Sequence, residues 1–146
     1  MLEGFTNSLS DDKSLPLDSK SATWGEMFYE IGRQKTGRPM DICYTIRDSV
    51  AAAGFTNIHE KVYKLPLGPW PRHPLYKEAG RLYLEEITVG LEGYAMQLLT
   101  HFGLPEPWSP EEVKVHLGGM LEEWANKKYH MYSLSRRIWC QKPYDA

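Results

Sequence analysis

The stretch that decides the fold is KLPLGPWPRHP, residues 64–74, which places four prolines and one tryptophan within eleven residues. Proline fixes φ and removes a backbone donor, so this stretch can form neither a helix nor a central strand. We therefore predict a stiff, extended loop that holds Trp70 between Pro69 and Pro71.

The segments on either side of this loop differ in periodicity. Residues 56–65, TNIHEKVYKL, alternate and are rich in β-branched and aromatic side chains, which predicts a strand that ends at Pro66. Residues 75–102 carry apolar side chains at helical spacing, which predicts a long helical region with a kink or break at Gly90 and Gly93. The loop is thus the exit from a sheet into a helical part.

The remaining elements are two helices before the strand, a helix after the long helical region, and a final strand. Apolar stripes predict helices at about 19–36 and 44–53. SPEE, residues 109–112, has the serine, proline and glutamate of a capping box and begins another helix. The last strand is expected at about 129–140. Because two strands make no stable sheet, either the loop-like residues 1–17 add a third strand or another chain completes the sheet.

Composition excludes several classes of protein. The chain has 146 residues, a formal net charge of −2 and no concentrated basic patch, so we expect a single domain that binds no nucleic acid. No signal peptide and no run of about 18 apolar residues is present, which predicts a cytoplasmic protein without a membrane span. Cys43 and Cys140 have no metal-type spacing and are interpreted as two reduced thiols.

Six stretches together resemble one family. They are SDDKSLP (10–16), GRPMD (37–41), AGFTNIHEKVYKLPLGPWP (53–71), GLEGYAMQLLT (90–100), WSPEEV (108–113) and YHMYSLSRRIWCQKP (129–143). On these stretches the chain resembles the C-terminal part of the fungal S-adenosylmethionine-dependent methyltransferase family that includes the LaeA-like proteins of secondary metabolism. The GPWP loop and the GLEGY run are the most specific pieces.

The resemblance implies an α+β fold: a partial sheet of two or three strands, the remnant of a class I methyltransferase fold, with a mostly helical insertion. The chain would begin near the fifth strand of the family's sheet. Residues 56–65 would be the sixth strand, and 129–140 the seventh, which lies between the other two. Within the single domain 1–146, the implied parts are a sheet-and-helix part (1–65), a helical insertion on the substrate side (66–128), and the final strand with its tail (129–146).

The family's cofactor site has no counterpart in the sequence. Class I methyltransferases use a Gly-rich turn after the first strand and an acidic residue at the end of the second. The only Gly-Gly pair here, in HLGGM (116–120), falls inside a helical stripe. We therefore expect no cofactor, and no metal either, because the five histidines lack metal-ligand spacing.

Three residues are candidates for catalysis. His101 and Tyr94 are seven residues apart, so they can share a helix face on the implied insertion, and histidine moves protons near neutral pH. Asp12 matches the acidic loop of the family, and its neighbour Asp11 is a candidate ligand contact. The alternatives are a helix C-terminal role for His101 and turn chemistry for the two aspartates.

Five more residues are candidates for substrate binding. Aromatic side chains line pockets but fill cores equally well, so a core position is the alternative for most of them. Trp70 is interpreted first as packing against the insertion helices and second as a pocket wall, and Arg81 belongs to a polar row that also fits a solvated helix face. The candidates are Trp24, Phe28, Trp70, Tyr83 and Arg81.

Three functions remain open. The first is a truncated methyltransferase-like protein that binds a small natural-product intermediate and catalyses a cofactor-independent cyclisation, isomerisation or dehydration. The second is an inactive fragment of a methyltransferase, and the third is a non-catalytic interaction module. We also expect a homodimer, because the family's sheet has further strands beside the first one here, and we expect helix 19–36 at or beside the contact.

Overall fold

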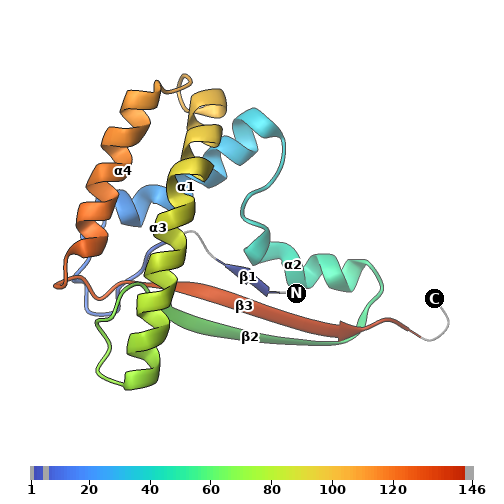
Figure 1. Ribbon diagram of the computed structural model, residues 1–146. Coiled ribbons are helices and arrows are strands. Elements are labelled where there is room, and N and C mark those ends of the chain that lie inside the picture. Colours follow the sequence, from blue (N-terminus) through green and yellow to red (C-terminus); the bar gives the residue numbers. More distant parts are fainter. Residues whose placement is uncertain (1, 5–6, 144–146) are drawn as a thin grey trace.

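The computed structural model describes residues 2–4 and 7–143, in which a three-stranded antiparallel sheet is combined with four α-helices (Figure 1). The elements in chain order are β1 (Leu2–Gly4), α1 (Lys20–Ile31), a π-helical turn η1 (Gly32–Thr36), α2 (Ile42–Ala52), β2 (Thr56–Pro66), α3 (Pro74–Phe102), α4 (Pro110–Ala125) and β3 (Tyr132–Gln141). The expected α+β class is confirmed.

The last strand of the chain is the centre of the sheet. The strand order is β1-β3-β2, and both neighbours run antiparallel to β3. Arg137 of β3 lies opposite Leu2 on one side and opposite Lys61 on the other. The first residues of the chain therefore supply the third strand, and the final strand lies between the other two, as the resemblance implies.

The proline loop leaves β2 as a rigid connection that α3 and the α4–β3 connection hold in place. The backbone N–H of Leu67 donates to the carbonyl of Met131, and that of Gly68 donates to the carbonyl of Gly80 in α3. Gly68 has a φ of +100°, which favours glycine. A Cβ on Gly80 would lie only 2.2 Å from the Gly68 carbonyl oxygen, so the loop packs directly on the backbone of α3.

Two helices differ from the expected outlines. The helix expected at 19–36 is divided into α1 and the π-helical turn η1. The residues after η1 fold back onto the helix at Gly32, where a Cβ would lie 2.7 Å from the Arg38 carbonyl oxygen. Instead of breaking at Gly90 and Gly93, α3 runs through both glycines as one helix of 29 residues. Apolar contacts along α3 support this length, since it contributes both partly buried and fully buried residues to the core.

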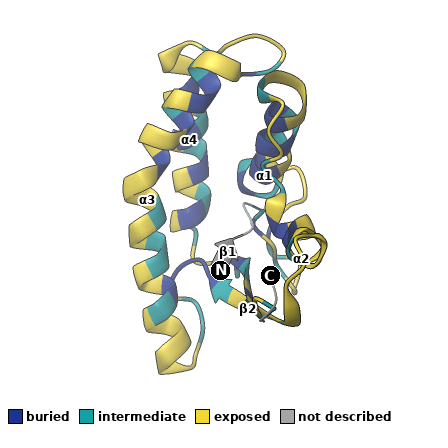
Figure 2. Cartoon of the chain, turned by 90° about the vertical axis from the view of Figure 1, so that its right-hand side faces the viewer, coloured by how far each residue is buried: buried dark blue, intermediate teal, exposed yellow. Residues whose placement is uncertain are grey.

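The core lies where α1, α3 and α4 face one another next to one end of the sheet. Figure 2 shows the buried positions on the facing sides of α1 and α4 and the exposed positions on their outer sides. The apolar stripe of α1 belongs to this core: Trp24, Phe28 and Ile31 are 7%, 0% and 0% exposed. The N-terminal half of α3 is mostly exposed.

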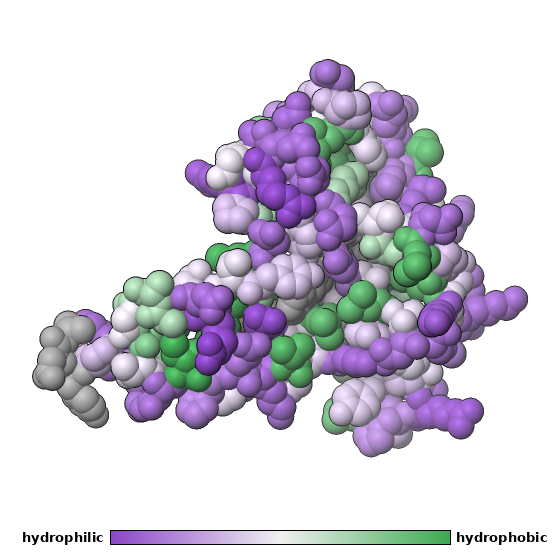
Figure 3. Space-filling model, turned by 180° about the vertical axis from the view of Figure 1, so that it is seen from behind, coloured by the Kyte–Doolittle hydropathy of each residue, from purple (hydrophilic) through white to green (hydrophobic). Residues whose placement is uncertain are grey.

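Among the described elements, α2 covers the far end of the sheet. There Glu60 of β2 pairs with Arg136 of β3 and with Arg47 of α2. Seen from behind, the molecule is mostly hydrophilic, and hydrophobic residues form separate areas (Figure 3). None of the helices described combines the length and apolar character needed to cross a bilayer.

Candidate functional site

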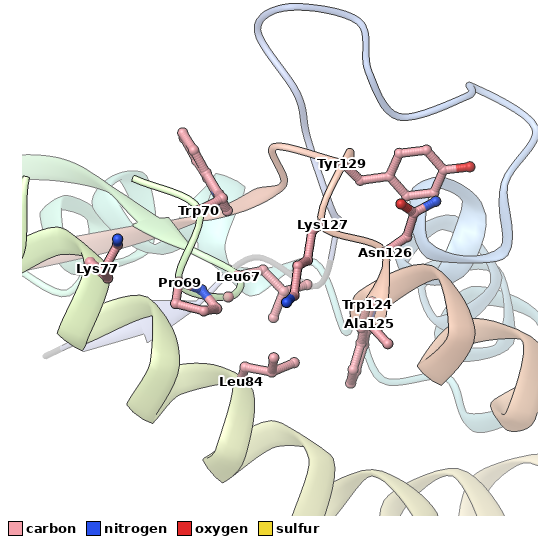
Figure 4. Close-up of a pocket in the computed structure, with 11 residues that line it drawn as sticks. Leu67, Pro69, Trp70, Lys77, Leu84, Trp124, Ala125, Asn126, Lys127 and Tyr129 are labelled. Carbon is pink, nitrogen blue, oxygen red and sulfur yellow. The ribbon is translucent and has the colours of Figure 1, made fainter. Parts of the chain in front are cut away.

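Two neighbouring grooves lie between the helices and the proline loop. The first, which we call the loop groove, has a volume of about 520 Å³. Figure 4 shows it between the loop after β2, Leu84 of α3 and Trp124 near the end of α4, with the Lys127 side chain extending toward Leu67. Its lining residues are Leu67, Gly68, Pro69, Trp70, Lys77, Leu84, Trp124, Ala125, Asn126, Lys127 and Tyr129.

The second groove, which we call the helix groove, lies along α3 and has a volume of about 400 Å³. Its walls are mostly apolar and aromatic, with Ser8, Glu86 and Ser133 as polar lining residues. It shares Leu67 and Trp124 with the loop groove, so the two adjoin. The other lining residues are Trp24, Tyr83, Ile87, Gly90, Leu91 and Tyr94. Volumes of a few hundred cubic ångströms with few polar groups are typical of small-molecule sites.

Four of the predicted aromatic residues come together at the helix groove. Trp24, Tyr83 and Tyr94 line it, and Phe28 lies behind them in the core. The Phe28 ring is 4.4 Å from that of Trp24 and 5.0 Å from that of Tyr94. Burial raises the pKa of Tyr94, so its hydroxyl is neutral near pH 7 and can donate a hydrogen bond.

Trp70 lines the loop groove and is fixed by the α4–β3 connection. Its indole Nε1–H donates to the Met131 carbonyl at 2.7 Å, and its ring lies 5.1 Å from that of His130. The tryptophan is partly exposed, so its free surface is available to the groove. Leu84 of α3 lines the same groove, which places the loop, the helix and the connection around one space.

Asp11 and Asp12 lie in the N-terminal loop and make different contacts. Asp11 binds Lys64 and accepts a hydrogen bond from the Tyr132 hydroxyl at 2.7 Å. The hydrogen bonds from Lys64 and then Tyr132 lower the pKa of Asp11. Asp12 accepts hydrogen bonds from the Ser10 hydroxyl, the Ser14 backbone and the His130 ring. The hydrogen bonds from Ser10, Ser14 and His130 hold the pKa of Asp12 far below its usual value. Because the pKa values of Asp11 and Asp12 are both lowered, both carboxylates are ionised at neutral pH.

His101 and Arg81 lie away from both grooves. The His101 ring contacts the Gln97 carbonyl and the Thr100 hydroxyl of its own helix. It is seven residues from Tyr94 along α3, about 10 Å, and the structure does not bring the two side chains together. Arg81 pairs with Glu78 and Glu85 on the exposed side of α3.

Several groove residues were not singled out from the sequence. Trp124 stands at helical spacing in an apolar stripe, a pattern that predicts a core position equally well, and Glu86 is one of many charged residues along α3. His130 was one of five scattered histidines. The sequence separates His130 from Asp12 by 118 residues, so no local pattern could have paired them.

The described residues do not fit the family's cofactor. The HLGGM stretch lies within α4, so its glycines do not form a turn after a strand. The loop after β2 offers one glycine in a turn, and the carbonyl of that Gly68 is covered by Gly80. In the part of the chain that the structure describes, no cluster of three or more histidine, cysteine or acidic side chains could hold a metal ion.

Three curated proteins illustrate the similarity of this chain to fungal sequences. Methyltransferase pytC of Aspergillus terreus is 34% identical over 135 residues, which are 92% of this chain and 40% of that protein. Secondary metabolism regulator LAE1 of Cochliobolus heterostrophus is 33% identical over 132 residues, 88% of this chain and 41% of that protein. Protein-methionine methyltransferase laeA of Emericella nidulans is 26% identical over 137 residues, 91% of this chain and 34% of that protein.

The similarity covers almost the whole chain but only part of each relative. The chain spans about two fifths of the length of the first of these proteins. No family model matches the chain, and no solved structure matches it. The strand order β1-β3-β2 is the one that the resemblance implies for the last three strands of the family's sheet. The partial coverage of the relatives fits a C-terminal segment of that family. The chain therefore belongs to the fungal methyltransferase family that includes the LaeA-like proteins.

Proposed function

We propose that this chain binds a small, flat and largely apolar intermediate of secondary metabolism in the two adjoining grooves. The observation that carries the proposal is the convergence of Trp24, Tyr83, Tyr94 and Trp124, from three helices, on one groove. Aromatic side chains offer large apolar surfaces and ring stacking to a flat ligand. Ser8, Glu86 and Ser133 could orient its polar groups.

The relatives support the class of ligand. One is a methyltransferase of Aspergillus terreus, and another is described as a regulator of secondary metabolism. We propose that the present chain also acts in secondary metabolism. The aromatic lining is a second, independent support, because it suits polyketide-like or indole-like molecules better than sugars or phosphates.

The reaction that we propose on this ligand is a cofactor-independent cyclisation, isomerisation or dehydration. Such steps need a shaped, desolvated site and one or two groups that move protons. Tyr94, whose hydroxyl is neutral, and Glu86 line the same groove and can form hydrogen bonds with the polar groups of the ligand during such a step. The described residues do not fit the family's cofactor, so the proposed reaction does not involve it.

A pair of glycines in α3 gives a matched test of binding. Gly90 lines the helix groove and Gly93 does not, yet a Cβ at either position would meet nothing within 4 Å. Gly90→Leu should therefore fill the groove without disturbing the helix, and Gly93→Leu should leave the groove open. Both substitutions favour the helix.

The measurement is the quenching of tryptophan fluorescence by 1-naphthol, with calorimetry as a second readout. The wild type and Gly93→Leu should bind the probe equally, and Gly90→Leu should bind it at least about tenfold more weakly, because a filled groove loses more than about 1.4 kcal/mol of contacts. Equal binding by all three proteins, or no binding by the wild type, would contradict the proposal.

A further inference from the structure

His130 lies at the rim of the loop groove. It follows Tyr129, which lines the groove, and its ring lies 5.1 Å from that of Trp70, which also lines it. The backbone N–H of His130 donates to the Ser14 hydroxyl at 2.8 Å, which fixes the connection against the N-terminal loop. The side chain is 45% exposed, so a molecule lying against Trp70 can reach the ring.

Asp12 holds one nitrogen of this ring. The His130 Nδ1 lies 2.5 Å from Oδ2 of Asp12. The other oxygen of the same carboxylate accepts hydrogen bonds from the Ser10 hydroxyl at 2.7 Å and from the Ser14 backbone at 3.0 Å. Three donors therefore fix the carboxylate, and the carboxylate in turn fixes the orientation of the ring.

This contact determines which nitrogen can exchange a proton. The pKa of Asp12 is far below its usual value, so its carboxylate only accepts hydrogen bonds at neutral pH. The Nδ1 of His130 must then carry the hydrogen, and Nε2 is left as the free base. A carboxylate that holds Nδ1–H also stabilises the imidazolium that forms when Nε2 takes a proton, as in the histidine of a Ser-His-Asp site.

We propose that His130 is the proton-transfer residue of this protein and that Asp12 is its positioning residue. The inference rests on the proposed function, because the substrate is the flat apolar molecule bound in the grooves. The Nε2 of His130 removes a proton from an acidic C–H or O–H of the ligand, and the electron pair left behind moves within the ligand. The imidazolium then returns the proton to another atom of the same molecule, so nothing is gained or lost overall.

A generic proton-transfer probe tests this role without knowledge of the natural substrate. In 5-nitrobenzisoxazole, a base removes the ring C–H proton while the N–O bond breaks, and the products are a coloured cyanonitrophenolate and the protonated base, which then passes the proton to the solvent. The wild type should open this ring at least about 100-fold faster than free imidazole at the same concentration. His130→Ala should fall to the rate of the buffer, and added imidazole should restore part of the activity.

His59→Ala is the matched control for His130→Ala. The His59 ring also stacks on a tryptophan, Trp139, at 5.4 Å, but it lies on the sheet. This variant should keep the rate of the wild type. Asp12→Asn should lower kcat about tenfold or more and leave KM within about twofold, because it changes the tautomer and orientation of His130 but not the groove.

The outcomes separate this inference from the proposed function. Two results would overturn the roles of His130 and Asp12 and leave the proposed function standing, provided that 1-naphthol binds. The first is a wild type that opens the ring no faster than free imidazole, and the second is a His130→Ala variant that keeps the rate of the wild type. Ring opening that depends on His130, without binding of 1-naphthol, overturns only the proposed grooves. Loss of activity in Tyr94→Phe together with full activity in His130→Ala would assign the proton transfer to the helix groove instead.

Discussion

The carboxylate of Glu123, near the end of α4, accepts hydrogen bonds from the backbone N–H groups of Lys20 at 3.0 Å and of Ser21 at 2.8 Å. It therefore acts as a distant cap on the first turn of α1, beside the local cap that Ser19 provides. The contact joins residues about 100 positions apart and holds together the two helices that carry Trp24 and Trp124.

Removing this distant cap should destabilise the protein. Glu123→Ala leaves two partly buried N–H groups of α1 without an acceptor, so the free energy of unfolding should fall by about 1–3 kcal/mol. Glu122→Ala, at the exposed neighbouring position, should change it by less than about 0.5 kcal/mol. Urea denaturation followed by tryptophan fluorescence measures both, and equal stability of the two variants would disprove the capping role.

Gly80 should tolerate no side chain, although it lies inside a helix. Alanine normally gains about 1 kcal/mol over glycine in a helix. Here the Cβ would meet the Gly68 carbonyl oxygen at 2.2 Å, and we expect Gly80→Ala to cost about 1–3 kcal/mol instead. Gly93→Ala, where a Cβ meets nothing within 4 Å, should stabilise by about 0.5–1 kcal/mol. Thermal unfolding of both variants checks the opposite signs.

His116 should make the stability depend on pH. Its ring stacks on Trp24 at 5.7 Å and meets the edge of Trp108 at 5.3 Å, and its Nε2 is buried without a hydrogen-bond partner. Burial, and then the charge of Lys20, lower its pKa from 6.5. The unfolded chain therefore binds the proton more tightly, so the stability from this residue is present above about pH 6.5 and is lost as the pH falls below that value.

A comparison of the wild type with His116→Phe separates the effect of His116 on the pH dependence of stability from the effects of the other histidines. The free energy of unfolding of the wild type should decrease more between pH 7.5 and pH 5.5 than that of His116→Phe, in which a ring of similar shape cannot be protonated. Parallel pH profiles of the two proteins would show that His116 does not contribute.

The chain by itself should not bind S-adenosylmethionine. The described residues offer no Gly-rich turn after a strand, and HLGGM is part of α4. Calorimetric titration should give no heat of binding up to about millimolar cofactor, far above the micromolar range. A micromolar dissociation constant would refute this expectation and would point to a cofactor site built differently from that of the family.

A homodimer remains our proposal for the assembly. In the described residues β1 pairs on one side only, and an unpaired edge favours pairing with a second copy. The edge of β2 is less suited, because it carries Lys61 and Lys64. The helix expected at or beside the contact, residues 19–36, buries Trp24, Phe28 and Ile31 in the chain's own core, so a partner could contact only its other side chains.

Light scattering at low micromolar concentration tests this proposal. A dimer should show about twice the 16.9 kDa of one chain and should bury more than about 2,000 Å². A mass of one chain at every concentration would mean that β1 ends the sheet without a partner.

Local patterns were enough for most of the secondary structure. The alternation of TNIHEKVYKL and the proline after it predicted β2, and SPEE predicted the first turn of α4 together with its capping box. These features depend on residues within a few positions of one another, which a sequence displays directly. The break expected at Gly90 and Gly93 was wrong, because packing of α3 on both sides of the two glycines outweighs their low helix propensity.

The sequence by itself determined the order of helices and strands, the rigid loop around Trp70 and the family. Only the tertiary structure decided which side chains meet. It placed Tyr94 beside Phe28 and separated Tyr94 from His101, and it brought Asp12 to His130 across 118 residues. The physical reason is that contacts between distant segments depend on how the sheet and helices pack, and no periodicity within a segment records that arrangement.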